Sequence, residues 1–191
     1  FEHDNTVLIE KFIPGREFRI FIINDEVVGI LHRVPANVTG DGVLNIGQLI
    51  DRKNEDPLRG KGYRTPLEKI RKGREEEMFL KQQGMDFNTV PKEGEVVYLR
   101  ENSNISTGGD SIDFTDDIDD SYKAIAVEAA KALNVKITGL DMMIQDIHAP
   151  ATPDNYAIIE MNFNPAIHIH CYPFKGKNRH LNHKMIKALG F

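Results

Sequence analysis

Two apolar runs of strand length near the C-terminus constrain the fold of this chain more than any other feature. The first run spans residues 137–144, and the second begins at Tyr156 and extends to Pro165. A proline-containing loop joins them, so we expect the two runs to pair as a β-hairpin. Because side chains alternate along a strand, Glu160 and Asn162 should share one face, with the flanking apolar residues on the other face.

Acidic side chains on this hairpin predict a metal site. A register that pairs Asp141 with Glu160 would bring two carboxylates together on one surface. Like charges held that close repel and raise the pKa of one of them unless a cation neutralises the pair. With Asn162 they form a set of hard oxygen donors that suits Mg²⁺. The alternative interpretation is a solvated polar face on which the acids oppose one another by chance.

Composition limits the classes of function. The 191 residues include 40% hydrophobic residues, enough for a core. A net charge of −5 and a pI near 5.8 argue against a nucleic-acid or anionic-membrane surface, which relies on basic excess. The single cysteine, Cys171, excludes an internal disulfide and suggests a reducing compartment, for which we expect the cytoplasm. The chain has no start methionine, signal pattern or membrane-length apolar run, and we expect it to be part of a longer polypeptide.

Hydrophobic periodicity and turn residues predict an α+β fold with a mainly antiparallel sheet flanked by helices, organised as one unit over residues 1–191. A long polar stretch at 101–115 is expected to be a functional loop. A capping box with proline at the first helical position, Thr65-Pro66-Leu67-Glu68, predicts the start of a helix. Strands are expected at 7–13, 18–23, 27–34 and 96–100 in addition to the hairpin, and helices at 46–53, 65–83, 118–133 and 178–189.

The end of the first predicted strand suggests a nucleotide contact. An edge strand that stops at Pro14 would expose the backbone groups of Lys11 and Ile13, which can read the edge of an adenine. Glu17 follows on the next strand, where a carboxylate can accept both hydroxyls of a ribose. A Pro-Gly pair between strands is usually only a turn, so this signal gains weight only together with the acidic hairpin.

Taken together, these motifs resemble the C-terminal lobe of the ATP-grasp ligases. The segment from Glu10 to Glu17 matches the hinge of that superfamily, and Asp141, Glu160 and Asn162 match its metal-binding set. The longer blocks resemble the glutathione synthetase module of the bacterial bifunctional glutamate–cysteine ligase/glutathione synthetase family, and the cyanophycin synthetases share parts of them more loosely. These blocks are residues 33–42, 56–60, 99–113 and 162–173.

The resemblance implies an ATP-dependent ligase that joins γ-glutamylcysteine to glycine through an acyl phosphate, with Mg²⁺ or Mn²⁺ at two positions. Upstream domains of the same polypeptide would act with this lobe, and they would include a small lobe whose lysines hold phosphates, so we expect the fragment alone to be inactive. Metal would lie at Asp141, Glu160 and Asn162. The catalytic arginine at the phosphate would be Arg33 and, with less support, Arg100 and Arg19. The nucleotide would contact Glu10, Lys11, Ile13, Glu17, Ser106, Thr107 and Gly108.

Several alternatives stay open at this stage. Within the class, the chain could be a cyanophycin-synthetase-like amino-acid ligase, and outside it a non-catalytic metal- or nucleotide-binding module. The Ser106–Gly109 segment is either an oxyanion site or a plain turn. His168, His170 and Cys171 could be zinc ligands, but on a strand Cys171 would point away from the two histidines, so substrate contacts or ordinary partial burial are favoured. The proposed chemistry needs no cysteine nucleophile.

Overall fold

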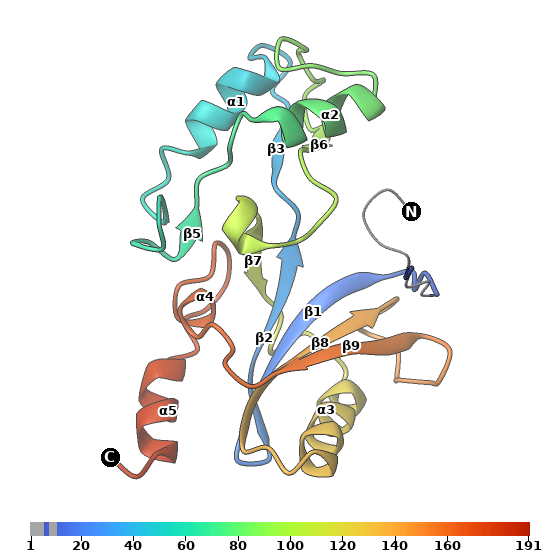
Figure 1. The fold of residues 1–191 in the computed structure, drawn as a ribbon, viewed down its shortest axis with the longest axis vertical. Helices are drawn as coiled ribbons and strands as arrows, with labels where there is room; N and C mark the ends of the chain where they lie inside the picture. Colours follow the sequence, from blue (N-terminus) through green and yellow to red (C-terminus); the bar gives the residue numbers. More distant parts are fainter. Residues whose placement is uncertain (1–5, 8–10) are drawn as a thin grey trace.

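The computed structural model describes residues 6–7 and 11–191 (Figure 1). Its centre is a five-stranded sheet with the order β7-β2-β1-β8-β9, in which every neighbouring pair is antiparallel. The α+β class and the mainly antiparallel sheet predicted from the sequence are therefore confirmed. The strands are β1 (Arg16–Ile23), β2 (Glu26–Val34), β7 (Asp110–Asp113), β8 (Ile137–Ile144) and β9 (Tyr156–Asn162).

One face of this sheet packs against helix α3 (Asp120–Ala132), which the sequence predicted at 118–133. Phe18, Ile20 and Ile22 alternate along β1 toward this helix and are fully buried together with Tyr122 of α3. The Asp119 side chain accepts a hydrogen bond from Ser121 N at 3.0 Å and so caps the helix start. The alternation leaves the remaining β1 side chains, among them Glu17 and Arg19, on the opposite face of the sheet.

A second, smaller core lies above the sheet in Figure 1, within residues 36–99. It contains α1 (Ile46–Lys53), which coincides with the predicted helix, and α2 (Arg74–Gln82). Two short pairs of strands complete this part: β3 (Asn37–Thr39) with β6 (Val96–Tyr98), and β4 (Arg59–Gly60) with β5 (Leu67–Glu68).

A buried polar hub joins this upper part to the sheet. Arg59 forms an ion pair with Asp110 at the start of β7 and donates from Nη1 to Gly108 O at 3.0 Å. Lys53 Nζ lies 2.7 Å from the same Asp110 carboxylate and 2.9 Å from Asn37 O. Burial lowers the pKa of both Lys53 and Arg59. The hub fixes the upper part over the edge of the sheet.

The helix predicted to begin at Thr65 is wrong over its first turns. Leu67 and Glu68 form strand β5, and the helix begins at Arg74 after the N-cap residue Gly73. The capping-box pattern failed because its glutamate, Glu68, binds the backbone of a preceding turn. The Glu68 carboxylate accepts hydrogen bonds from the backbone N–H groups of Gly62 at 3.2 Å and Tyr63 at 2.5 Å, instead of closing a helix turn.

The segments around the predicted loop also differ from expectation. Residues 101–115 contain a 3₁₀ turn at Ile105–Thr107 and the edge strand β7, which the polar sequence concealed. The strand expected at 96–100 ends at Tyr98. Of the strand expected at 7–13, residues 8–10 lie outside the described part, while residue 7 and residues 11–13 belong to no strand.

The C-terminal segment covers part of the other face of the sheet. It forms α4 (His168–Cys171) and α5 (Leu181–Ala188), the second of which is shorter than the helix predicted at 178–189. Leu181 and Cys171 pack against Phe21 and Val28 in a third core cluster. The expectation of a strand over His168–Cys171 is wrong, because these residues form a helical turn. No helix in the described part of the chain is long and apolar enough to cross a bilayer.

The β8–β9 hairpin forms as predicted and contains one irregularity. Asp141 pairs with Glu160, but Met142 then pairs with Ile158, so Ile159 is an extra residue on β9. Such a β-bulge re-aims side chains, and Ile159 is 55% exposed beside the same cleft as Glu160. The predicted separation of Ile159 and Glu160 onto opposite faces is therefore wrong, whereas Met161 does pack on the core.

Candidate functional site

A single row of paired residues crosses all five strands on the face opposite α3. Its members, read from β7 to β9, are Asp113, Leu31, Arg19, Asp141 and Glu160, each paired with the next. Directly opposed residues of antiparallel strands share a face, so three acids and one arginine lie on one surface. This surface is the floor of the candidate site.

Four side chains on this floor form what we call the cleft cluster: Glu17, Arg19, Arg33 and Asp141. The Asp141 carboxylate accepts hydrogen bonds from Arg19 Nε, from Arg19 Nη2 at 2.8 Å and from Arg33 Nη2 at 2.9 Å, and Asp141 is 2% exposed. Arg33 also pairs with Glu17. Two guanidinium groups thus balance two carboxylates, and within the described residues Arg33 Nε is buried without a hydrogen-bond partner.

Glu160 and Asn162 lie beside this cluster on β9. The Asn162 amide donates to Glu160 Oε1 at 2.9 Å, and the Asn162 backbone carbonyl accepts from Thr138 Oγ1 at 2.9 Å. Because the amide nitrogen is the donor, the amide oxygen is the atom available to a cation. In the described part of the chain no three His, Cys, Asp or Glu residues gather in a metal-binding group. The predicted set has only two carboxylates and an amide, which is a donor set of the kind that Mg²⁺ accepts.

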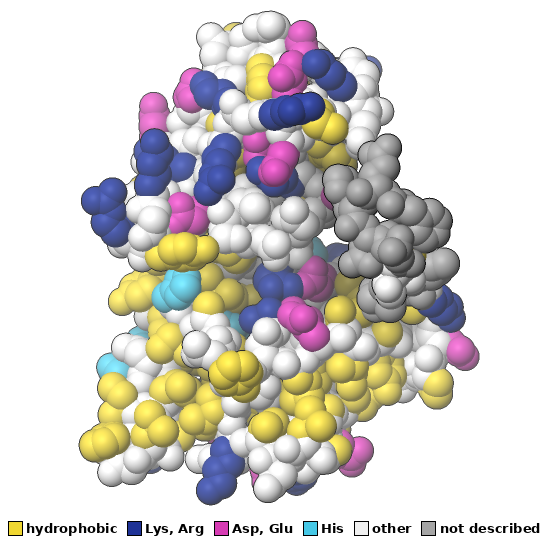
Figure 2. Space-filling model, in the orientation of Figure 1, with side chains coloured by type: hydrophobic (Ala, Val, Ile, Leu, Met, Phe, Trp, Pro, Cys, Tyr) yellow, Lys and Arg dark blue, Asp and Glu magenta, His cyan; other side chains and the backbone are white. Residues whose placement is uncertain are grey.

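A cleft of about 820 Å³ lies over the cleft cluster. In Figure 2, acidic and basic side chains meet at the waist of the molecule, between the upper part and the sheet. Met143 and Ile159 add an apolar patch to the floor, and Phe79, Gln83 and Tyr98 of the upper part line the other wall. The volume lies within the roughly 300–1,000 Å³ range of small-molecule sites.

Several predicted site residues line this cleft. Glu17 accepts a hydrogen bond from Ser103 Oγ in addition to its pairing with Arg33. Arg100 points from the opposite wall and is held by α2 through an Nε to Glu76 Oε1 bond of 2.6 Å. Burial and the nearby Arg16 lower the pKa of His32, which also lines the cleft, to about 4, so this imidazole is neutral at pH 7.

The other predicted nucleotide contacts that the structure describes are not among the residues that line this cleft. Glu10 is outside the described residues, and Lys11 and Ile13 precede β1 without strand structure. Thr107 Oγ1 bonds to its own turn, at 2.9 Å from Asn104 O, and the Gly108 carbonyl accepts from Arg59. Gly108 has φ +96°, and an added Cβ would lie 2.8 Å from Ile70 Cα, so this position needs glycine.

A second cavity of about 190 Å³ adjoins the first, and Ser106 lines it. Arg33 and Asn104 line both cavities and form their common wall. His168 also lines the second cavity, and burial lowers its pKa. His170 is fully buried and edge-on to Phe21, 5.4 Å between ring centroids, and burial lowers its pKa to about 3.

Known proteins similar to this chain identify its family. No protein-family model matches the sequence. The glutathione biosynthesis bifunctional protein of Desulfotalea psychrophila is 65% identical over 191 residues, which are 100% of this chain and 24% of that protein. The protein with the same description from Clostridium perfringens is 59% identical over 189 residues, 99% of this chain and again 24% of the relative. This chain belongs to the family of bifunctional glutathione biosynthesis proteins. It spans about a quarter of their length.

A solved structure of the family has the same fold. The crystal structure of a bifunctional glutathione synthetase from Pasteurella multocida matches 93% of this chain and 25% of that chain, with a TM-score of 0.84 and 47% sequence identity. The predicted ATP-grasp fold is confirmed. The family to which the chain belongs is that of the bifunctional glutathione biosynthesis proteins and not that of the cyanophycin synthetases.

The structure adds residues that sequence reasoning missed. Ser103 contacts Glu17, and Met143 with Ile159 supplies the apolar floor of the cleft. Arg19, which had less support, is the principal partner of Asp141. The strand pattern could have placed Arg19 on the cleft face, because Arg19 shares a face with Glu17. The same pattern puts Ile159 on the wrong face, because the bulge reverses the orientation of this residue.

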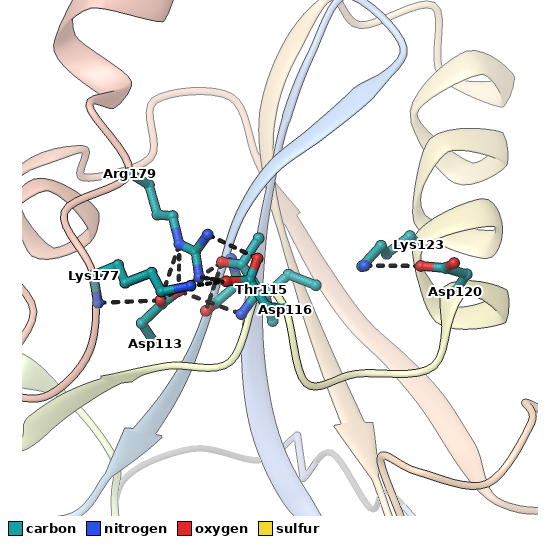
Figure 3. Close-up of polar contacts among 8 residues, drawn as sticks. Asp113, Thr115, Asp116, Asp120, Lys123, Lys177 and Arg179 are labelled. Carbon is teal, nitrogen blue, oxygen red and sulfur yellow. Dashed lines mark hydrogen bonds and ion pairs between the residues drawn. The ribbon is translucent and has the colours of Figure 1, made fainter.

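A second arginine–aspartate group lies at the other end of the row, and we call it the edge cluster: Asp113, Asp116, Lys177 and Arg179 (Figure 3). Arg179 Nε lies 2.9 Å from both Asp113 oxygens, and Arg179 Nη1 lies 2.9 Å from Asp116 Oδ1. Lys177 Nζ donates to Asp116 at 2.7 Å. These bonds attach the segment before α5 to β7.

Proposed function

We propose that this chain is the nucleotide- and metal-binding lobe of an ATP-dependent carboxylate–amine ligase of the glutathione synthetase type. The proposed reaction joins γ-glutamylcysteine to glycine, with ATP converted to ADP and phosphate. One observation carries the proposal. Asp141, Glu160 and two arginines converge on the floor of a nucleotide-sized cleft, in a chain 65% identical throughout to a glutathione biosynthesis bifunctional protein.

The arrangement of charges suits activation of a carboxylate. A carboxylate is a poor electrophile, and phosphoryl transfer onto it depends on positioned cations far more than on a protein nucleophile. Arg33 and Arg100 line the cleft from opposite walls, and Arg19 donates to Asp141, which also lines the cleft. Planar guanidinium groups can bind phosphoryl and carboxylate oxygens by paired hydrogen bonds. Asp141, Glu17 and Glu76 hold these groups in place by ion pairs, so little ordering remains for the moment of reaction.

The donor set fits a divalent cation, Mg²⁺ or Mn²⁺. Asp141 and Glu160 would hold one ion, and Glu160 with the Asn162 amide oxygen a second. Bound there, such an ion would neutralise phosphate oxygens during transfer. Glu17 would accept the ribose hydroxyls, and the backbone at Lys11 and Ile13, with Glu10, would contact adenine. Arg33 now divides its bonds between Glu17 and Asp141, and nucleotide phosphates would give it a competing partner.

The proposed reaction also has consequences for the cellular compartment of the enzyme and for the other domains of the full-length protein. The thiol of γ-glutamylcysteine and the free Cys171 are compatible with a reducing compartment, so we propose a cytoplasmic enzyme. The remaining three quarters of the related proteins would supply the other domains that complete the site.

The test uses the full-length protein that contains this chain. With ATP, Mg²⁺, γ-glutamylcysteine and glycine, it should release phosphate and form glutathione in equal amounts. Glu160→Gln should lower kcat/KM about 10²–10³-fold, as expected for loss of an electrostatic contact in the transition state. Glu128→Gln, an exposed glutamate on α3, is the matched control and should retain activity. Full turnover by Glu160→Gln, or none by the wild type with these substrates, would refute the proposal.

A further inference from the structure

The basic residues of this chain are concentrated in one short segment. Residues 61–74 contain six of the 24 Lys and Arg residues but only one of the 29 Asp and Glu residues. The segment therefore carries a net charge of +5, whereas the other 177 residues together carry −10. Such an asymmetry within an acidic chain indicates attraction of negatively charged molecules. We call the six cations the basic rim: Lys61, Arg64, Lys69, Arg71, Lys72 and Arg74.

The structure leaves most of the charge of the basic rim without an opposite partner. All members of the rim are exposed except Lys69, which is half-buried. Among the residues that the structure describes, Lys72 alone of the rim pairs with an acid, Asp51, at 2.7 Å. Arg64 Nε donates to Lys61 O at 3.2 Å, a bond that compensates neither charge. In Figure 2, Lys and Arg side chains gather on the side of the upper part where β5 lies, so a positive field extends into the solvent there.

The basic rim borders a groove that adjoins the candidate site. The groove has a volume of about 670 Å³, and Glu68 lines both this groove and the second cavity of about 190 Å³. Arg33 in turn lines both the second cavity and the cleft over the cleft cluster. An anion attracted to the rim would therefore arrive close to Arg33. The members of the rim that line the groove are Lys61, Lys69, Arg71 and Lys72.

The lining of the groove argues against tight binding of an anion within it. Asp51, Glu55 and Glu68 line the groove together with the four cations, so the charges there nearly balance. A long polyanion such as a nucleic acid would also meet the acidic remainder of the chain, with its net charge of −10. The positive excess of the rim acts over about one Debye length, roughly 8 Å at physiological ionic strength. It therefore suits small anions that pass the rim on their way to the site.

The reactants of the proposed function differ in charge. ATP is a polyanion, and γ-glutamylcysteine, with two carboxylates and one ammonium group, is an anion at pH 7. Glycine is a zwitterion without net charge. Charged surfaces beside a cleft can raise the association rate of an oppositely charged substrate by about 10–10³-fold. A positive field at the candidate site would thus favour ATP and γ-glutamylcysteine and leave glycine unaffected.

We infer that the basic rim attracts the anionic reactants, ATP and γ-glutamylcysteine, to the candidate site by long-range electrostatics. This inference rests on the proposed function. The rim contacts neither the reacting atoms nor glycine, so its neutralisation should lower kcat/KM for the anionic reactants and leave kcat and the KM for glycine unchanged. The effect should disappear at high ionic strength, because salt screens exposed charges.

The test uses the full-length protein and a variant without four charges of the rim, Lys61→Gln/Arg64→Gln/Lys69→Gln/Arg71→Gln. At an ionic strength of about 20 mM, its kcat/KM for γ-glutamylcysteine should be about three- to tenfold below wild type, and at about 0.5 M within about twofold. The matched control changes the net charge equally by removing four exposed lysines on or beside α3 and α5, and it should stay within about twofold of wild type throughout: Lys131→Gln/Lys136→Gln/Lys184→Gln/Lys187→Gln.

The outcomes distinguish this inference from the proposed function. If the full-length wild type forms no glutathione, the proposed function fails and the inference fails with it. If the wild type is active and both quadruple variants respond alike at low ionic strength, the role of the rim is wrong while the ligase assignment remains. Should the rim variant express poorly, the wild type alone supplies a test. Its kcat/KM for γ-glutamylcysteine should fall more steeply with ionic strength than that for glycine, and equal slopes would overturn the inference.

Discussion

The cleft cluster and the edge cluster each contain an aspartate of the same cross-strand row that is paired with arginine. They differ in the kinds of groups that donate hydrogen bonds to that aspartate. Asp113 accepts from Arg179, from the Thr115 hydroxyl at 2.6 Å and from Lys177 N at 3.3 Å. Among the residues that the structure describes, Asp141 accepts only from arginine side chains, one of which it shares with Glu17.

That difference separates a group that holds the chain from one that can exchange partners. Burial opposes ionisation of Asp113, but the hydrogen bonds from Arg179 and Thr115 outweigh it and lower the pKa of Asp113. Burial likewise opposes charge on Arg179, and its bonds to Asp113 and Asp116 raise its pKa. At the cleft cluster Arg33 divides its ion pairs between Glu17 and Asp141 and lines the cleft, where an anion can compete for it. The edge cluster should therefore govern stability, and the cleft cluster activity.

The largest expected effect is on activity at the cleft cluster. Asp141→Asn in the full-length protein should lower kcat/KM about 10²–10³-fold, because it removes a proposed metal ligand and the partner of two arginines. Asp113→Asn is the matched change at the other end of the row and should stay within about threefold of wild type. Steady-state phosphate release measures both. Equal losses in the two variants would end the distinction between the clusters.

The next effect is on local stability at the edge cluster. Arg179→Met leaves the buried Asp113 without its main partner, which should cost about 3 kcal/mol in the free energy of local opening. Hydrogen exchange of peptides from β7 and α5 should then be about 100-fold faster. Arg71→Met, at an exposed arginine, is the control and should leave exchange unchanged. Unchanged protection in Arg179→Met would mean that the edge cluster does not hold the segment.

The pH dependence of the edge cluster has a definite sign. Since folding lowers the pKa of Asp113 below its ordinary value of 3.8, its contribution is present above about pH 4 and is lost as the pH falls through the folded value. The wild type should therefore exceed Asp113→Asn in local opening free energy by about 1–3 kcal/mol at pH 6. The difference should shrink as the pH falls below about 4 and the carboxylate is protonated. Hydrogen exchange of the β7 peptide, corrected for intrinsic rates, measures the difference, and a gap that widened in acid would contradict the assignment.

The smallest effect is expected at the exposed edge of the same cluster. Lys177→Met removes an ion pair to Asp116 in which the lysine side chain is 73% exposed. Such pairs contribute about 0–1 kcal/mol, and salt screens them. The same exchange measurement at low and high salt should show a difference from wild type only at low salt. An effect as large as that of Arg179→Met would show that the lysine, and not the arginine, is the principal attachment.

The sequence predicted those features that depend on local pattern. The strands β1 and β2, the helices α1 and α3 and the pairing of Asp141 with Glu160 followed from periodicity and from one hairpin. It failed where tertiary contacts decide. Glu68 accepts from the N–H groups of a turn and does not cap a helix, and β7 forms because its aspartates meet basic partners more than 50 positions away. At the site, the acids were predictable from strand faces, but the partition into two cavities was not, because it depends on how residues 59–68 lie over the sheet.

The extra residue in β9, Ile159, decides which faces of the sheet Glu160 and Tyr156 occupy. On one side of Ile159 the strand presents Glu160 to the cleft, and on the other side it pairs Tyr156 with Ile144 and turns the tyrosine toward the core against Tyr122. Glu160 and Tyr156 are four positions apart, so a strand without a bulge would place both on one face, and the extra residue is what puts them on opposite faces, as Asp141 and Ile144 are on β8. Deletion of Ile159 should thus leave Glu160 paired with Asp141 and Tyr156 paired with Ile144, because it removes only the residue that has no partner on β8.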